Sequence, residues 1–311
     1  MSHSIRISPK IKENESCFRE VFKDCADILF HTMELGRGKT VDCFVIYLEV
    51  AVSNMILEKS VLGKFINELC KVSGDEILER VEKNALGISD AVQLDTVEDV
   101  VAGVFAGDAV FFIDGYAHAV KISEKGYPSM GVSEADREKV LRGSKEGFTD
   151  SVKTNSALIR KRIRNPGMKV KEQTIGRRSQ TKIQILYIEG LARSEILEEL
   201  ETKLSDFEID GVLDSGVIEQ LTKENWLSPF PQFQTTERPD KCAMELLNGR
   251  VVLLVDNSPV GLLIPAVFND FLQVSEDEYQ TFELATFLRV LRYLAVGCAM
   301  LFSGLYLAVT D

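Results

Sequence analysis

The sequence predicts an α/β protein with two repeated, similar α/β subdomains (mixed sheets with hairpins and packed helices) followed by a membrane-entering C-terminal helix. Residues 34–53 resemble residues 174–193 at a constant separation of 140 positions. Residues 107–115 resemble residues 249–257 at a separation of 142 positions. Two ordered matches at nearly one separation indicate that one α/β unit occurs twice. Residues 293–309 carry no charged side chain, which predicts the C-terminal helix.

Two long hairpins occupy matching places in the repeat. The first spans residues 28–35 and 41–50, and the second spans residues 168–175 and 183–188. In the second hairpin apolar and polar residues mix before the turn, whereas Ile, Leu and Tyr dominate after it, as in a buried strand. Gly176 lies at the bend between its two strands.

The other elements of the first unit follow from apolar spacing and from capping residues. We expect helices over residues 13–23, 53–72 and 74–83, a strand over 92–94, and a hairpin of 109–113 with 116–122. Thr96, with Asp99 three positions later, predicts the start of a helix that runs to Phe105. Asp114 and Gly115 form a typical pair for the hairpin turn.

The second unit repeats this plan. We expect helices over residues 149–163, 194–204, 217–221 and 241–247, a strand over 210–214, an irregular or extended segment over 228–240, and a hairpin of 251–255 with 260–264. Pro166 and Gly167 end the first of these helices, and Asn248 and Gly249 end the last.

These elements divide the chain into four parts. The expected boundaries are 1–123 for the first subdomain, 124–147 for a linker, 148–265 for the second subdomain, and 266–311 for a membrane-proximal amphipathic helix and first transmembrane helix. The linker combines glycine, serine and proline with charged residues, as connecting segments do.

Composition excludes some classes of function. Of the 311 residues, 45% are hydrophobic and 27% are charged, which is typical of a folded globular chain. The formal net charge of −12 argues against nucleic acid as a partner, because phosphate binding requires a basic surface. Six cysteines without CxxC spacing indicate free thiols in a reducing compartment.

The uncharged segment 293–309 has two interpretations, a buried core helix or a membrane helix. Its length is below the ~20 residues of a typical spanning helix and near the ~17-residue lower limit. Arg289 and Arg292 precede it and would keep the preceding chain cytoplasmic. We favour the membrane helix and expect the chain to be the front part of a longer, truncated protein.

Familiar catalytic and binding patterns are incomplete. Residues 38–40 read Gly-Lys-Thr, but a phosphate-binding loop also needs a glycine at position 33, which is Met33. Residues 206–211 resemble the start of a calcium loop, but its closing position is Val217 instead of glutamate. The sequence therefore predicts no metal, no cofactor and no catalytic residue.

Two polar features remain. One is a basic cluster: Arg160, Lys161, Arg162, Arg164, Lys169, Lys171, Arg177, Arg178 and Lys182. It predicts either a solvated helix face or a contact surface for anionic lipid or an acidic partner. The other is the segment 228–240, either a rigid loop over the core or a recognition loop, in which Arg238 could pair with one of three acids. These acids are Glu237, Asp240 and Asp214.

Several motifs together resemble the A subunit of spore germinant receptors, the GerA family. They are GSKEGF (143–148), TNSALIRKRI (154–163), IGRRSQT (175–181), YIEGLA (187–192), IDGVLDSGVIEQL (209–221), SPFPQFQTTERPD (228–240), LLNGRVVLLVD (246–256) and FLRVLRYLA (287–295). The resemblance covers residues 90–311 well and the first unit loosely. It implies a subunit of the spore inner membrane with a cytoplasmic N-terminal region, working with receptor B and C subunits.

The resemblance also implies a non-enzymatic role in a nutrient receptor that triggers germination. Its membrane part would self-associate, contact lipid and conduct ions, while the soluble region would serve assembly and signal coupling. The residues we expect to make such contacts are Arg177, Arg178, Pro229, Pro231, Glu237, Arg238 and Asp240. The alternative function is a tandem α/β small-molecule-binding module with a ligand cleft between the two units.

Overall fold

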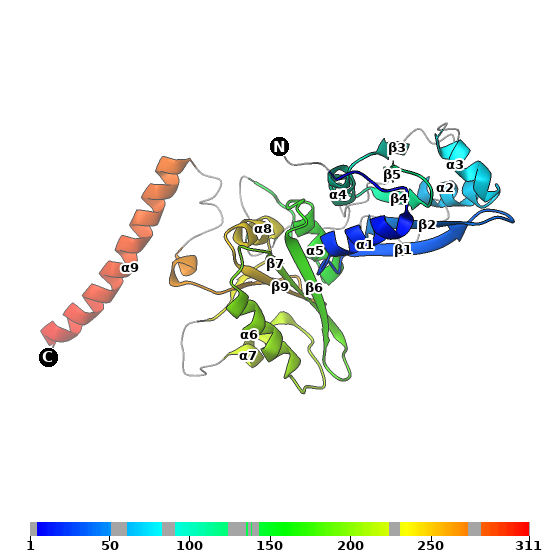
Figure 1. The fold of residues 1–311 in the computed structure, drawn as a ribbon. Helices are drawn as coiled ribbons and strands as arrows, with labels where there is room; N and C mark the ends of the chain where they lie inside the picture. The colour runs from blue at the N-terminus through cyan, green and yellow to red at the C-terminus, as the bar shows by residue number, and fades with distance from the viewer. Residues whose placement is uncertain are drawn as a thin grey trace.

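In the part of the chain that the structure describes there are two five-stranded sheets, each covered by helices on both faces. A computed structural model describes residues 5–50, 61–82, 91–123, 135, 138, 143–223, 231–272 and 281–310. Figure 1 shows the two units as neighbouring lobes, the first in blue to cyan and the second in green to yellow. The last helix, in orange to red, stands apart from both lobes.

The first sheet has the strand order β1-β2-β4-β5-β3. Its strands are β1 (Ile28–Leu35), β2 (Val41–Leu48), β3 (Ala91–Leu94), β4 (Ala109–Ile113) and β5 (Ala119–Ile122). Helices α1 (Ile11–Val21) and α4 (Val97–Phe105) pack on one face, and α2 (Val61–Leu69) and α3 (Gly74–Glu82) pack on the other. Because both faces are covered, β2 is buried from Cys43 to Leu48.

The second sheet has the same order, β6-β7-β9-β10-β8. Its strands are β6 (Met168–Ile175), β7 (Thr181–Ile188), β8 (Gln234–Thr236), β9 (Val251–Val255) and β10 (Gly261–Ile264). Helices α5 (Val152–Arg160) and α8 (Pro239–Leu247) cover one face, and α6 (Ser194–Ser205) and α7 (Ser215–Thr222) cover the other. The predicted repeat is therefore present in the fold.

The repeat extends to individual hydrogen bonds. The Asn14 side chain bonds both backbone groups of Ser8, with its Oδ1 accepting at 2.9 Å and its Nδ2 donating at 2.7 Å. In the second unit Asn155 does the same with Thr149, at 2.8 Å and 2.6 Å. Each buried asparagine closes the loop that leads into its helix, so the two units begin in the same way.

Every ladder between the described strands is antiparallel, whereas the sequence predicted mixed sheets. The reason lies in the β3-α4-β4 crossover and its counterpart in the second unit. Strands β3 and β4 run in the same direction, but β5 lies between them and runs the opposite way. Neighbouring strands therefore never run parallel.

One local prediction requires correction. Residues 210–214 form no strand, because their carbonyl groups accept hydrogen bonds from the turn after β6 instead. Arg178 N donates to Asp210 O at 2.8 Å, and Thr181 Oγ1 donates to Val212 O at 2.5 Å. Over its described residues the segment 228–240 is mostly irregular or extended, as predicted; it includes β8, and its last two residues begin α8. Its residues 228–230, most of the linker and the acids at 276–278 lie outside the described residues.

The chain ends in a short 3₁₀ helix, η2 (Phe268–Phe271), and a long helix, α9 (Phe282–Thr310). Large apolar side chains of α9 are exposed, among them Phe282, Phe287, Leu294, Leu301, Phe302 and Tyr306. Over the parts of the chain that the structure describes, no helix combines the length and apolar character needed to cross a membrane.

Candidate functional site: the joint between the subdomains

The loop after α1 joins the first subdomain to the edge of the second sheet. Asp24 has a left-handed backbone with φ of 58°, which turns the chain toward β6. Ala26 N donates to Val170 O at 2.9 Å, and Val170 N donates to Asp24 O at 2.8 Å. Cys25 thereby forms a parallel bridge with Val170. The first subdomain covers part of an edge that would otherwise expose unpaired backbone groups.

A buried ion pair crosses the same joint. Arg160, at the end of α5, has no exposed side-chain surface, and it binds both carboxylate oxygens of Asp27 at 2.8 Å and 3.0 Å. Its Nη1 also donates to Met168 O at 2.7 Å, and its guanidinium lies 4.9 Å from the centre of the Phe105 ring. Burial favours a lower pKa for Arg160, but the charge and hydrogen bonds of Asp27 outweigh it and raise the pKa.

Flanking contacts reinforce the joint on both sides. Lys169 Nζ donates to Lys23 O at 2.9 Å, and Lys153 Nζ pairs with Glu49 Oε1 at 2.5 Å. The buried Cys25 Sγ lies 3.7 Å from Met168 O, and burial raises the pKa of its thiol. The joint therefore combines backbone pairing, two ion pairs and a thiol kept neutral.

A polar hollow of about 410 Å³ lies beside the joint. It is lined by Glu20, Val21, Lys23, Asp24, Pro166, Gly167, Lys169 and Glu189, which come from both subdomains. Among the described residues, no group of three or more His, Cys, Asp or Glu side chains is placed to hold a metal ion.

Arg177 and Arg178 lie together at the tip of the hairpin of β6 and β7, and both are exposed. Arg178 Nε is 3.7 Å from Asp210 Oδ1, and these side chains are 85% and 71% exposed. An ion pair so open to water contributes little to stability. The Arg178 ion pair therefore contributes little to the fold, and both arginines face solvent.

Arg238 has the opposite environment. Its side chain is 2% exposed and pairs with Asp240, one of the three acids considered, Nη2 to Oδ2 at 2.5 Å and Nε to Oδ1 at 3.1 Å. The guanidinium also donates to the carbonyl groups of Glu138 and Ser144 in the linker, each at 3.2 Å. Arg238 thus holds these two linker residues against the second subdomain.

Glu138 completes this contact from the linker side. Its carboxylate accepts from Thr236 Oγ1 at 2.5 Å, from Glu237 N at 3.1 Å and from Lys241 Nζ at 3.2 Å. Glu237 contributes through its backbone, since its carbonyl also accepts from Phe148 N at 2.9 Å. Pro229 lies outside the described residues.

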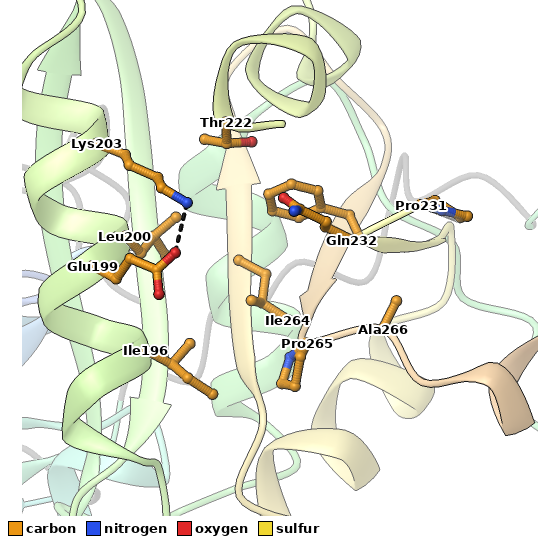
Figure 2. A pocket seen from close by; sticks show the side chains of 11 residues that line it. Ile196, Glu199, Leu200, Lys203, Thr222, Pro231, Gln232, Ile264, Pro265 and Ala266 are labelled. Carbon is orange, nitrogen blue, oxygen red and sulfur yellow. Dashed lines mark hydrogen bonds and ion pairs between the residues drawn. The ribbon is translucent and has the colours of Figure 1, made fainter. Parts of the chain in front are cut away.

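Pro231 lines a groove of about 360 Å³ in the second subdomain, between α6 and the end of β10 (Figure 2). The walls are mainly apolar and comprise Ile196, Glu199, Leu200, Lys203, Thr222, Pro231, Gln232, Phe233, Ile264, Pro265 and Ala266. Lys203 Nζ and Glu199 Oε1 pair at 2.6 Å on the α6 wall. This groove is separate from the joint between the subdomains.

The basic cluster from the sequence does not form one surface. Arg160 and Lys169 are buried in the joint, and several others pair with nearby acids. Those pairs are Lys161 and Arg162 with Glu146, Lys171 with Glu201, and Lys182 with Glu172. The nine residues therefore do not share one face, and contact of the exposed members with anionic lipid or an acidic partner stays a prediction.

The sequence analysis did not identify three acids, Asp27, Glu49 and Glu138. Asp27 and Glu49 form ion pairs across the joint, and Glu138 binds the second subdomain from the linker. Asp27 lies directly before a strand, where an isolated acid gives no periodic signal. The available clue was Arg160, a charged residue among the apolar positions of its predicted helix.

Comparison with known proteins assigns the family. The family model described as Bacillus/Clostridium GerA spore germination protein matches residues 16–311. The chain belongs to this family. Related proteins include the uncharacterized membrane protein YfkQ of Bacillus subtilis, 34% identical over 97% of this chain and 58% of that protein. Spore germination protein GerLA of Bacillus cereus is 35% identical over 97% of this chain and 62% of that protein.

A solved structure has a similar fold. It is the N-terminal domain of the A subunit of the Bacillus megaterium spore germinant receptor GerK3, with a TM-score of 0.64 and 26% identity. The match covers 86% of this chain and 98% of that domain. The chain spans about three-fifths of the length of the curated relatives it matches.

Proposed function

We propose that this chain is a non-enzymatic A-type subunit of a spore germinant receptor, and that its soluble region serves assembly and signal coupling. The observation that carries the proposal is the combined match of residues 16–311 to the GerA family and of the fold to a receptor A-subunit domain. The division at residues 123, 147 and 265 remains part of this proposal.

The joint supports a coupling role, because it ties the two subdomains together with directional contacts. The ion pair of Arg160 with Asp27 is buried, and such pairs favour one specific arrangement over others. A signal that reaches one subdomain would then move the other with it. The exposed Arg177 and Arg178 are the proposed contacts to neighbouring subunits, whereas Arg238 and Asp240 act by holding the linker.

We also propose that the C-terminal part associates with the spore inner membrane and leaves the N-terminal region cytoplasmic. The exposed apolar side chains of α9 support this placement. The expected partners are receptor B and C subunits, further copies of the chain and membrane lipid. The oligomeric membrane part would conduct ions.

Copurification from spores tests this function. An affinity tag on the full protein should retain the receptor B and C subunits from detergent-solubilised spore membranes, and Arg178→Glu should reduce their recovery. A matched variant, Arg164→Glu, changes another exposed arginine and should leave the recovery unchanged. Retention of neither subunit by the unchanged protein would contradict the proposal.

A second candidate function has one specific observation in its favour. The polar hollow of about 410 Å³ lies between the subdomains, where a ligand cleft was expected. Its charged rim suits a small polar zwitterion. A concentration-dependent rise in the unfolding temperature with free amino acids would favour this function, provided that Lys169→Met abolishes the rise.

A further inference from the structure

The 3₁₀ helix η2 is fixed to the second sheet by one arginine. Arg250 immediately precedes β9, and its Nη1 and Nη2 bind the two carboxylate oxygens of Asp270, each at 2.8 Å. The two side chains are only 16% and 7% exposed. Two parallel charge-assisted hydrogen bonds of this kind fix both position and orientation.

The same guanidinium reaches two other elements of the second subdomain. Its Nε lies 3.0 Å from Glu245 Oε2 on α8, and its Nη1 donates to Gln234 Oε1 on β8 at 3.1 Å. Asp270 Oδ2 in turn accepts from Val267 N at 2.8 Å, which closes the first turn of η2. Arg250 therefore holds α8, β8, β9 and η2 together.

On its other side η2 contacts the long C-terminal helix. Arg292 Nη1 donates to Leu272 O at 3.1 Å, and the Tyr293 hydroxyl donates to the Asn269 side-chain oxygen. A continuous series of polar contacts thus runs from the sheet, through Arg250 and Asp270, to α9. Each contact joins groups on different elements, so the series connects the second sheet physically to α9.

The first unit has no arginine at the position equivalent to Arg250. The position 142 residues before Arg250 is Asp108, which is 2% exposed and carries an oxygen without a described hydrogen-bond partner. Asp108 lies 3.7 Å from Lys121 of its own sheet and cannot bind a carboxylate. Only the copy that precedes η2 and α9 has an arginine at this position.

We propose that η2 is the coupling element between the second subdomain and α9, with Arg250 as its positioning residue. This inference rests on the proposed receptor function for its biological meaning, and it names the residues through which the soluble region controls the C-terminal helix. Breaking the pair of Arg250 and Asp270 releases η2 from the sheet and leaves the sheet folded.

Amide hydrogen exchange on the whole 311-residue chain in detergent tests the coupling directly. Arg250→Met should speed exchange across residues 267–272 and 283–295 by about tenfold, while β9 and β10 keep their rates. Asp270→Asn should do the same. The matched control Arg162→Met removes an arginine of 21% exposure that pairs with Glu146 at 2.6 Å and should change neither segment.

Unchanged exchange in α9 would overturn the inference, as would equal acceleration in β9. Germination of spores that carry the complete protein gives a second readout. Slower germination of the Arg250→Met strain, with normal protein level, supports the inference. Normal germination of that strain overturns it if the deletion strain is defective, whereas normal germination of the deletion strain refutes the proposed receptor function instead.

Discussion

Arg19 and Arg160 lie at equivalent positions of the two subdomains, 141 residues apart, but they make different contacts. Arg19 is 55% exposed, pairs with Glu15 one turn earlier and lies 4.8 Å from the Phe30 ring. Arg160 is fully buried and pairs with Asp27 of the other subdomain. Both copies have an arginine near the end of this helix, but only the arginine of the second copy binds the other subdomain.

The contrast separates the contacts that both subdomains share from the contacts that connect one subdomain to the other. The asparagine that closes the entry loop and the aspartate that caps the first helix occur in both copies. Asp114 Oδ1 accepts from Ile11 N at 3.0 Å, and Asp256 Oδ1 accepts from Val152 N at 3.1 Å. The ion pair of Arg160, which occurs in one copy alone, lies where the subdomains meet.

Arg160→Met should have the largest effect on stability. It leaves the Asp27 carboxylate buried without its partner, which costs about 3–5 kcal/mol of unfolding free energy. Urea unfolding of the whole chain measures this loss. Arg19→Met, the equivalent change in the first copy, should stay within about 0.5 kcal/mol because that arginine faces water. Equal losses in the two variants would remove the proposed distinction.

Asn14→Ala and Asn155→Ala should have smaller effects that match each other. Each substitution leaves backbone groups of an entry loop without partners, at a cost of about 1–3 kcal/mol. Parallel urea unfolding curves measure both. Because the hydrogen bonds of the two asparagines correspond, a difference above about 1 kcal/mol would mean that the copies are not equivalent units.

Thr96→Ala should cost about 1 kcal/mol, because the Thr96 side chain accepts from Asp99 N and caps α4. At the matching end of α8, the Arg238 side chain makes no cap hydrogen bond and instead pairs with Asp240. Arg238→Met should therefore loosen the linker as well as the helix. Limited proteolysis between residues 124 and 147 should accelerate in Arg238→Met and not in Thr96→Ala.

Arg178→Glu should have the smallest effect on the fold. The side chain is 85% exposed, so the midpoint of thermal unfolding should not move. The same change should weaken association with partner subunits by reversing an exposed charge. A fall in the midpoint equal to that of Arg160→Met would show that the hairpin tip is structural.

The repeat and most helices and strands could be predicted from the sequence, because glycines, turn pairs and apolar periodicity are local signals. The hairpin of β6 and β7 and the Thr96 cap were predicted within a few residues of their observed places. The sequence did not predict that neighbouring strands are antiparallel, because the position of β5 between β3 and β4 depends on tertiary packing.

The candidate site was less accessible to sequence reasoning. Arg160 and Asp27 are 133 residues apart, and nothing near Asp27 indicates that it is buried. The sequence analysis grouped Arg160 with its basic neighbours because these residues are close in sequence. In the fold their side chains point to different surroundings. Arg238 and Asp240 were predictable as a pair because they lie two residues apart.

The rate of Cys25 alkylation is the most direct test of the joint. Cys25 is buried between the subdomains, whereas Cys70 is exposed in the first subdomain and serves as an internal standard. Iodoacetamide labelling, followed by peptide mass spectrometry, should be slow at Cys25 in the unchanged chain and in Arg19→Met, and about tenfold faster in Arg160→Met. Labelling of Cys25 as fast as Cys70 in the unchanged chain, or at one rate in all three proteins, would contradict a joint held by Arg160 and Asp27.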